Sequence, residues 1–315
     1  MNDVHVNKED EVLAKLDAFA ELPDAPPKRK LKLSWVGKIA SLVVIFWLVI
    51  VAIGPTIAPH HEMDMDGDDT FMVAHSNEYG DFFLGTDHLG RDTLSRVLYG
   101  ARNTIGIALL ATLLAYSLGI TLGILAAVKG GWIDMGISRV NDAILALPSI
   151  MLGLIVIAAL GSSIPILIGT AGVIYATSVF RIARALGQDI MVQDFVESAH
   201  ARGERIWWII KSEVLPNAAM PLATDFGLRL VFVVLFISSL SFLGLGVQPP
   251  ASDWGSMVRE NLAGLSAGID LDGNTVTSYA AIWPALAIAS FTIAVNLIVD
   301  DISAKSGGSL AKKMI

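Results

Sequence analysis

Long apolar runs dominate this 315-residue sequence, in which only 17% of the residues are charged. A helix needs about 20 mostly apolar residues to cross a bilayer. Six runs approach or exceed that length, at 36–58, 104–128, 140–161, 166–180, 216–246 and 281–299. Because the backbone polar groups of a spanning segment must bond internally, such runs form helices. The sequence therefore predicts an all-α integral membrane protein with six transmembrane helices.

The apolar runs divide the chain into five regions. They are an N-terminal tail at 1–34, a first transmembrane helix at 35–58, an outer loop at 59–102, a core of five transmembrane helices at 103–302 that includes a polar loop at 188–217, and a C-terminal tail at 303–315. The first apolar run begins too far from the N-terminus for a signal peptide, so we expect it to be an uncleaved anchor.

Basic residues predict the orientation of these helices. Lys28, Arg29, Lys30 and Lys32 lie just before the first apolar run, and Lys305 and Lys312 follow the last. Cytoplasmic segments of membrane proteins carry an excess of Lys and Arg. Both termini and the polar loop at 188–217 are therefore expected on the cytoplasmic side.

The polar loop at 188–217 is predicted to contain two short helices. Asp194 is a candidate cap, Val196 and Ala199 recur at helical spacing, and Gly203 breaks the pattern. After the break, Ile206, Trp207, Ile209 and Ile210 indicate a second apolar face, and Leu215–Pro216 is expected to end that helix. By pattern alone, the loop could equally be a simple surface connection.

Three features inside the apolar runs suggest how the helices interact. Gly119 and Gly123 form a GxxxG pattern that favours close helix packing, and Pro148 predicts a kink in the third run. Asp225 and Arg229 are spaced i to i+4, which predicts an ion pair. Because the pair is expected near the cytoplasmic end of its helix, a structural role is favoured over a substrate or proton site.

The outer loop begins with a run of potential metal ligands. They are His60, His61, Glu62, Asp64, Asp66, Asp68 and Asp69. Their spacing does not define a coordination geometry, so a solvated acidic loop is favoured over a metal site.

Motifs for catalysis are missing from the sequence. It contains no phosphate-binding loop, no HExxH pair and no nucleophile elbow, and it contains no cysteine. We therefore predict no catalytic, cofactor-binding or metal residues and no enzymatic activity. A nucleic acid partner is not expected either.

Three segments resemble one transporter family. Glu197-Ser198-Ala199, Gly203 and Val214-Leu215-Pro216 resemble the EAA loop of binding-protein-dependent ABC importer permeases, except that the family usually has Ala where this chain has Ser198. The segments FLGTDHLGRDTLSRVLYGAR at 83–102 and SLSFLGLGVQPPASDWGSMVRE at 239–260 resemble C-type permeases of the dipeptide, oligopeptide and nickel subfamily.

The resemblance implies a type I importer permease in a bacterial-type inner membrane. Its implied partners are a second homologous permease subunit, two ATP-binding subunits and an extracytoplasmic substrate-binding protein, with ATP and Mg²⁺ held by the ATP-binding subunits. The coupling role of the family's loop falls on Glu197, Ala199, Gly203, Leu215 and Pro216. Peptides are the first expected substrate and nickel the second. The alternative is a stand-alone ion- or proton-coupled transporter.

Overall fold

The computed structural model describes residues 33–67, 69–266, 269–271 and 274–311. The predicted N-terminal tail at 1–34 lies almost entirely outside the described residues. The C-terminal tail expected at 303–315 continues the last helix as far as residue 311, and residues 312–315 also lie outside.

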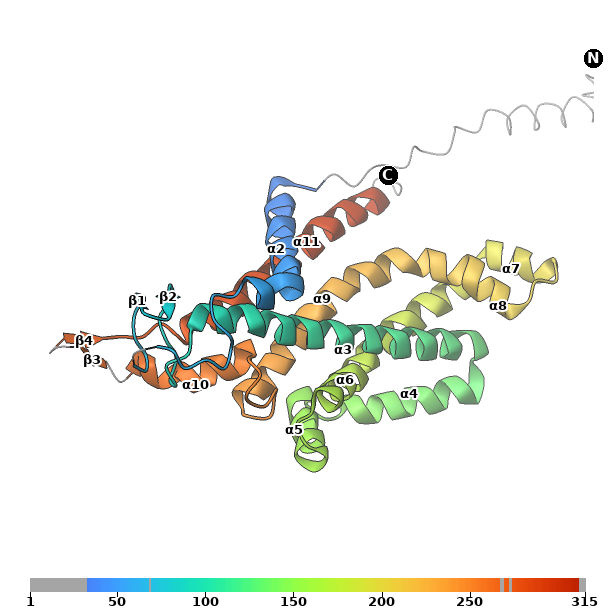
Figure 1. Ribbon diagram of the computed structural model, residues 1–315. Helices are drawn as coiled ribbons and strands as arrows, with labels where there is room; N and C mark the ends of the chain where they lie inside the picture. The colour runs from blue at the N-terminus through green and yellow to red at the C-terminus, as the bar shows by residue number, and fades with distance from the viewer. Residues whose placement is uncertain (1–32, 68, 267–268, 272–273, 312–315) are drawn as a thin grey trace, which may run out of the picture. The chain divides into compact units, whose positions relative to one another are not determined.

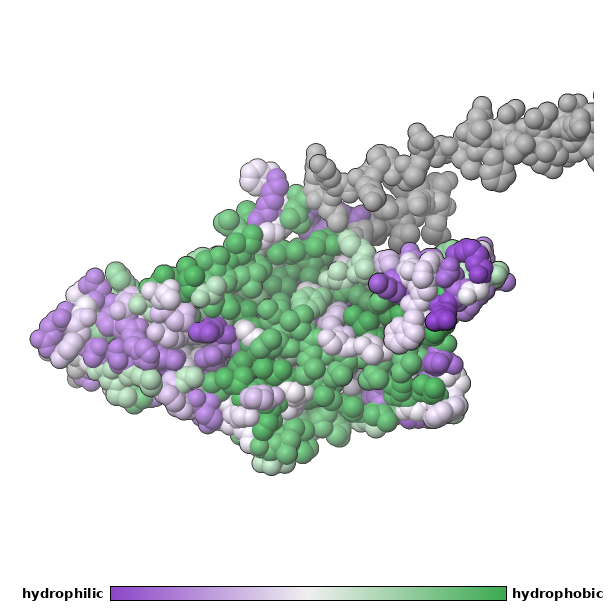
Figure 2. Space-filling model, turned by 45° about the vertical axis from the view of Figure 1, so that its right-hand side comes forward, coloured by the Kyte–Doolittle hydropathy of each residue, from purple (hydrophilic) through white to green (hydrophobic). Residues whose placement is uncertain are grey.

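Five helices of the described chain are long and apolar enough to cross a bilayer (Figure 1). They are α2 (Trp35–Ile57), α3 (Thr93–Lys129), α6 (Ile164–Met191), the run Ile206–Phe242 that contains α9 (Leu215–Phe242), and the Ile282–Lys305 part of α11 (Ile282–Ala311). Figure 2 shows apolar surface between two polar ends, as a bilayer-spanning protein requires. The predicted all-α membrane fold is confirmed.

The third predicted span, at 140–161, is a bent pair of helices. α4 (Gly131–Leu145) and α5 (Ser149–Leu160) meet at 88°. Pro148 lies at the break and accounts for it, because proline disfavours helical geometry in the residue before it. The predicted kink is therefore a sharp bend, and the first of its two helices begins at Gly131, before the predicted run.

α3 begins earlier than the predicted span at 104. It is one helix of 37 residues, and the Asp92 side chain caps its start by accepting a hydrogen bond from the Ser95 N–H at 2.8 Å. A helix of this length is about 55 Å long, which exceeds the hydrocarbon thickness, so part of α3 extends outside the membrane.

The predicted GxxxG packing is confirmed between α3 and α6. A Cβ atom added at Gly119 would lie 2.6 Å from Val179 Cβ, and one added at Gly123 would lie 2.7 Å from the Phe180 carbonyl oxygen. Only glycine permits this approach of the two helices.

Small elements occupy the end of the bundle at which α3 begins, where the outer loop was predicted. β1 (His75–Asn77) pairs antiparallel with β2 (Gly80–Phe82), with His75 opposite Phe82. β3 (Ile269–Leu271) pairs antiparallel with β4 (Asn274–Val276), with Ile269 opposite Val276. The region after the fifth span, expected to be a loop, contains α10 (Trp254–Ser266). Figure 1 shows these elements at the opposite end of the bundle from α7 (Asp194–Ala201) and α8 (Ile206–Ile209).

The helix that begins at Ile206 does not end at Pro216. α8 continues into a π-helical turn, η1 (Ile210–Val214), and then into α9. The Leu215 N–H donates to the Ile210 carbonyl, five residues earlier. This widened turn precedes Pro216 directly and accommodates the residue that cannot donate a backbone hydrogen bond. The prediction that Leu215–Pro216 ends the helix is therefore wrong.

Candidate functional site

α7 and α8 form a projection, residues 194–209, at the end of the helix bundle opposite to β1–β4. Val196 and Ala199 of α7 are fully buried and pack with Ile124 of α3, Ile209 of α8 and Val214 of η1. Asp194 lies in the first turn of α7, and the N-cap position belongs to Gln193. The hydrophobic contacts therefore anchor α7 to α3 and to the start of the helical run that begins at Ile206.

Gly203 has a defined role at the end of α7. Its φ angle is +79°, the Gly203 N–H donates to the His200 carbonyl, and the Glu204 N–H donates to the Ala199 carbonyl. These two bonds form the Schellman motif that closes many helices, in which glycine takes the left-handed position. The structure thus gives Gly203 a fixed conformation, where the sequence indicated only a break.

The projection exposes side chains of mixed chemistry. Glu197 and Ser198 point away from the packed face that holds Ala199. Trp207 keeps 77% of its surface exposed and Phe195 keeps 40%. Large apolar side chains beside charged ones at an exposed surface are typical of a protein-binding site.

The intramembrane pair occupies the middle of its helix. Asp225 and Arg229 lie near the midpoint of the Ile206–Phe242 run. Arg229 Nη2 donates to Asp225 Oδ1 at 3.2 Å and Nε donates to Oδ2 at 3.3 Å. The Tyr116 hydroxyl of α3 donates to Asp225 Oδ2 at 2.6 Å.

A second ion pair, which the sequence analysis missed, joins α4 to α6. Arg184 donates through Nε and Nη2 to the two oxygens of Asp134, a bidentate arrangement. The partners are 50 residues apart, so no local spacing could have indicated the contact.

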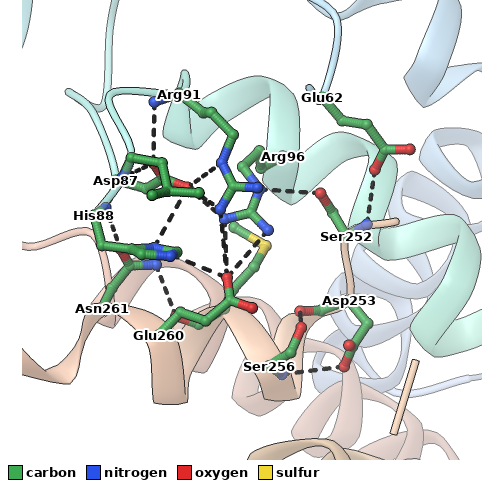
Figure 3. Close-up of polar contacts among 12 residues, drawn as sticks. Glu62, Asp87, His88, Arg91, Arg96, Ser252, Asp253, Ser256, Glu260 and Asn261 are labelled. Carbon is green, nitrogen blue, oxygen red and sulfur yellow. Dashed lines mark hydrogen bonds and ion pairs between the residues drawn. The ribbon is translucent and has the colours of Figure 1, made fainter. Parts of the chain in front are cut away.

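An outer polar network joins the start of α3 to α10 (Figure 3). Asp87 is fully buried and accepts hydrogen bonds from Arg91 Nε at 2.8 Å and from Arg96 Nη1. Glu260 of α10 lies 3.3 Å from Arg96 Nη1 and 3.5 Å from Arg91 Nη2. The His88 N–H donates to Asn261 Oδ1 at 3.0 Å. Two carboxylates and two guanidinium groups are therefore paired in one buried cluster.

The same network holds the segment before α10. Arg96 Nε donates to Ser252 Oγ at 3.1 Å, and the Ser252 N–H donates to Glu62 Oε2 at 2.7 Å. Next to it, the buried Trp254 donates from Nε1 to the Val97 carbonyl at 2.9 Å. The two segments that resemble one transporter subfamily, 83–102 and 239–260, thus contact each other directly.

Burial and charge determine the titration of this network. Burial raises the pKa of the Asp87 carboxyl, but the guanidinium groups of Arg96 and Arg91 outweigh burial and hold that pKa below its ordinary value. Burial lowers the pKa of His88, and the carboxylates of Asp87 and Glu260 offset only part of this effect. Asp87 is therefore ionised and His88 neutral near pH 7.

The candidate metal ligands of the outer loop are not gathered into a site in the part of the chain that the structure describes. His60 stacks on Phe82 of β2, with ring centroids 4.5 Å apart. The His60 N–H donates to Ser95 Oγ at 2.9 Å. His60 therefore contributes to packing at the start of α3.

Comparison with known proteins gives consistent matches. Residues 119–304 match the family described as "Binding-protein-dependent transport system inner membrane component". The glutathione transport system permease protein GsiD of Pectobacterium atrosepticum is 33% identical over 264 residues, which cover 81% of this chain and 82% of that protein. The GsiD protein of Escherichia coli O6:K15:H31 is 32% identical over 278 residues, 86% of each chain.

A solved structure shares the fold. It is a crystal structure of an amino acid ABC transporter with histidines, and its matching chain has a TM-score of 0.50 at 14% sequence identity. The match covers 67% of this chain and 94% of the other. At this identity the likeness concerns the arrangement of helices alone.

Proposed function

We infer the function of this chain from the family to which it belongs, that of binding-protein-dependent transport system inner membrane components. The chain is the membrane permease subunit of an ABC importer. It is a transport protein and not an enzyme, and the ATP hydrolysis that drives import takes place in partner subunits. The match over residues 119–304 carries this conclusion.

The proposed assembly contains four kinds of subunit. A second, homologous permease completes the translocation pathway, two ATP-binding subunits hold ATP and Mg²⁺, and an extracytoplasmic binding protein delivers the substrate. The family supports partners of these types. The projection is then cytoplasmic, the outer polar network faces the other side, and both chain ends are cytoplasmic in an inner membrane.

We assign coupling to the projection. Glu197 and Trp207 would contact a cleft on the ATP-binding subunit, while Ala199 and Gly203 hold α7 in position from within the chain. Leu215 and Pro216 follow the π-helical turn that links the projection to α9. The support for this assignment is the division of the projection into a buried anchoring face and an exposed face.

The proposed substrate class is short peptides. Two of the matching relatives are named for transport of glutathione, which is a tripeptide. Nickel, the second expectation from sequence, has no comparable support among these relatives.

Cross-linking tests the assembly because the chain contains no cysteine. A Ser198→Cys variant, in which the new thiol is exposed on the projection, should cross-link through a short bismaleimide to a cysteine in the ATP-binding subunit. The exposed Ile45 of α2 provides the control, and Ile45→Cys should give no product. Import that proceeds in a complex whose projection cannot be cross-linked in any nucleotide state would contradict the assignment.

Uptake tests the substrate class. Proteoliposomes with the complete complex and binding protein should accumulate labelled di- and tripeptides when ATP is enclosed. Accumulation of ⁶³Ni²⁺ without peptide uptake would reverse the proposed substrate.

A further inference from the structure

The intramembrane pair of Asp225 and Arg229 is incompletely covered by the chain itself. The side chain of Arg229 retains 18% of its exposure and that of Asp225 retains 11%, although both lie in the middle of an apolar helix. A charged side chain at this depth is expensive against lipid, so such residues face protein or a water-filled cavity. The face of α9 that carries the pair is therefore directed away from lipid.

The Arg229 guanidinium is held loosely. Its two hydrogen bonds to Asp225 measure 3.2 and 3.3 Å, whereas charge-assisted hydrogen bonds usually measure about 2.7–2.9 Å. Arg91, in the outer network, lies 2.8 Å from its carboxylate. Arg229 also lies over the Phe232 ring, 5.8 Å from the centroid. Its remaining donors are available to another acceptor.

Asp225 does not depend on Arg229 alone. The Tyr116 hydroxyl donates to Asp225 at 2.6 Å, so the carboxylate keeps a partner when the guanidinium turns away. Losing one partner of a buried ion pair is otherwise strongly unfavourable. The arrangement therefore permits Arg229 to exchange its acceptor.

A groove between α3 and α9 is lined in part by Tyr116, the hydrogen-bond partner of Asp225. It has a volume of about 430 Å³ and is lined by Tyr116, Ile120, Leu215, Ala219, Leu222, Ala223 and Phe226. On α6, the Tyr175 hydroxyl donates to the Phe232 carbonyl of α9 at 3.2 Å. Polar groups from α3, α6 and α9 thus lie along this part of α9.

We propose that Asp225 and Arg229 line the translocation pathway and that Arg229 is a transient binding site for a carboxylate of the transported peptide. The substrate carboxylate replaces Asp225 as the acceptor and is released when Asp225 returns. Because Asp225 competes with the substrate carboxylate for Arg229, the site binds the peptide weakly. A translocation pathway must bind its substrate weakly enough to release it. The proposal rests on the proposed function in so far as the cargo is a peptide.

The position of Arg229 is tested by chemical labelling. In the complete complex, Arg229→Cys should react with a charged, membrane-impermeant methanethiosulfonate reagent, and transported peptide should slow the reaction. Ile45→Cys should not react, because Ile45 is 57% exposed in the single chain but lies on α2 among apolar side chains that face lipid. Failure of Arg229→Cys to react in every nucleotide state, or reaction that transported peptide does not slow, would overturn the proposal.

The chemical role of Arg229 is tested by transport. Arg229→Gln should lower peptide uptake about tenfold, the loss expected for one charge-assisted hydrogen bond, and Arg229→Lys should retain more uptake. The double variant Asp225→Arg with Arg229→Asp keeps the ion pair but moves the positive charge from position 229 to position 225. Uptake restored by the exchange would show a purely structural pair and contradict the proposal.

These outcomes separate the two levels of inference. A wild-type complex that takes up no peptide would refute the proposed substrate, whatever the labelling shows. Unreactive cysteine at position 229 in a complex that does import peptide would refute the pathway position alone.

Discussion

The two polar ends of this chain are built in opposite ways. In the outer network, Asp87, Arg91 and Arg96 are buried and their charges are paired within the chain. On the projection, Glu197 and Trp207 are exposed, and burial is confined to the face that anchors α7. Folding alone pairs the charges of the outer network, whereas the projection keeps large side chains exposed in the single chain.

This difference predicts that the outer network determines the folding stability of the chain, and that the projection determines its association with the proposed ATP-binding subunit. Breaking the outer network leaves a buried charge without a partner, which destabilises the folded chain. Changing an exposed side chain of the projection costs little folding stability but removes contacts made in the assembly. Four substitutions test the separation.

The largest effect is expected for Arg96→Met. The substitution leaves the carboxylates of Asp87 and Glu260 with fewer cationic partners and should lower the free energy of unfolding by about 3–5 kcal/mol. Thermal unfolding of the purified complex measures the change. Arg102, exposed on the same helix, provides the control, and Arg102→Met should change stability by no more than about 0.5 kcal/mol. If Arg96→Met and Arg102→Met lowered the free energy of unfolding equally, the buried network would have no special role in stability.

Trp207→Ala should have the next largest effect, on association. Loss of an exposed aromatic anchor should weaken binding of the ATP-binding subunit by about 2 kcal/mol while the thermal unfolding of the permease stays unchanged. Titration of the ATP-binding subunit onto the reconstituted permease measures the affinity. Trp35 is similarly exposed, at 78%, but lies on α2, so Trp35→Ala is the matched control. If Trp207→Ala lowered the folding stability of the permease but left its affinity for the ATP-binding subunit unchanged, Trp207 would have a structural role like that of the outer network.

Gly203→Val should destabilise the folded conformation of the projection by about 1–2 kcal/mol, because a β-branched residue disfavours the left-handed backbone at φ +79°. We expect substrate-stimulated ATP hydrolysis to fall while the protein remains in the membrane. Gly136→Val is the control, since a Cβ atom at either glycine meets open space and only Gly203 has a positive φ. Full stimulated hydrolysis by Gly203→Val would count against coupling through α7.

The smallest effect is expected for the pH dependence of the outer network. The pKa of His88 is lower in the folded chain than its ordinary value of 6.5, so the unfolded chain binds more protons between those two pKa values. Stability should therefore fall as the pH drops below 6.5 and through the folded-state pKa. His88→Asn should remove that part of the acid sensitivity. The His88 side chain keeps 27% exposure, so the change is small. An identical pH profile for both proteins would show that His88 makes no contribution.

The sequence predicted the transmembrane architecture well because bilayer burial depends on residue composition over about 20 positions. It also predicted the break at Gly203, since glycine is a local signal. Pro148 indicated a kink, but the 88° angle depends on how α5 packs and is not a property of one proline. Leu215–Pro216 does not end the helix, because the π-helical turn before it, which composition does not indicate, accommodates the proline.

The outer network could not be predicted for a different reason. Arg96 and Glu260 are 164 residues apart, and each alone is an ordinary charged residue on a helix. Only the folding of α10 against the start of α3 brings them together. The same holds for Tyr116 and Asp225, 109 residues apart, whose contact places the intramembrane pair in the middle of the bundle.

The unbroken helical run from Ile206 to Phe242 has a mechanical consequence. Its 37 residues make an arm about 55 Å long, with the projection at one end and Arg229 partway along it. The π-helical turn at Ile210–Val214 lies between the two, so a tilt imposed at Ile206 would reach the guanidinium only through the most easily deformed turn of the helix. The flexibility of that turn would then set how much of a movement at the projection arrives at Arg229.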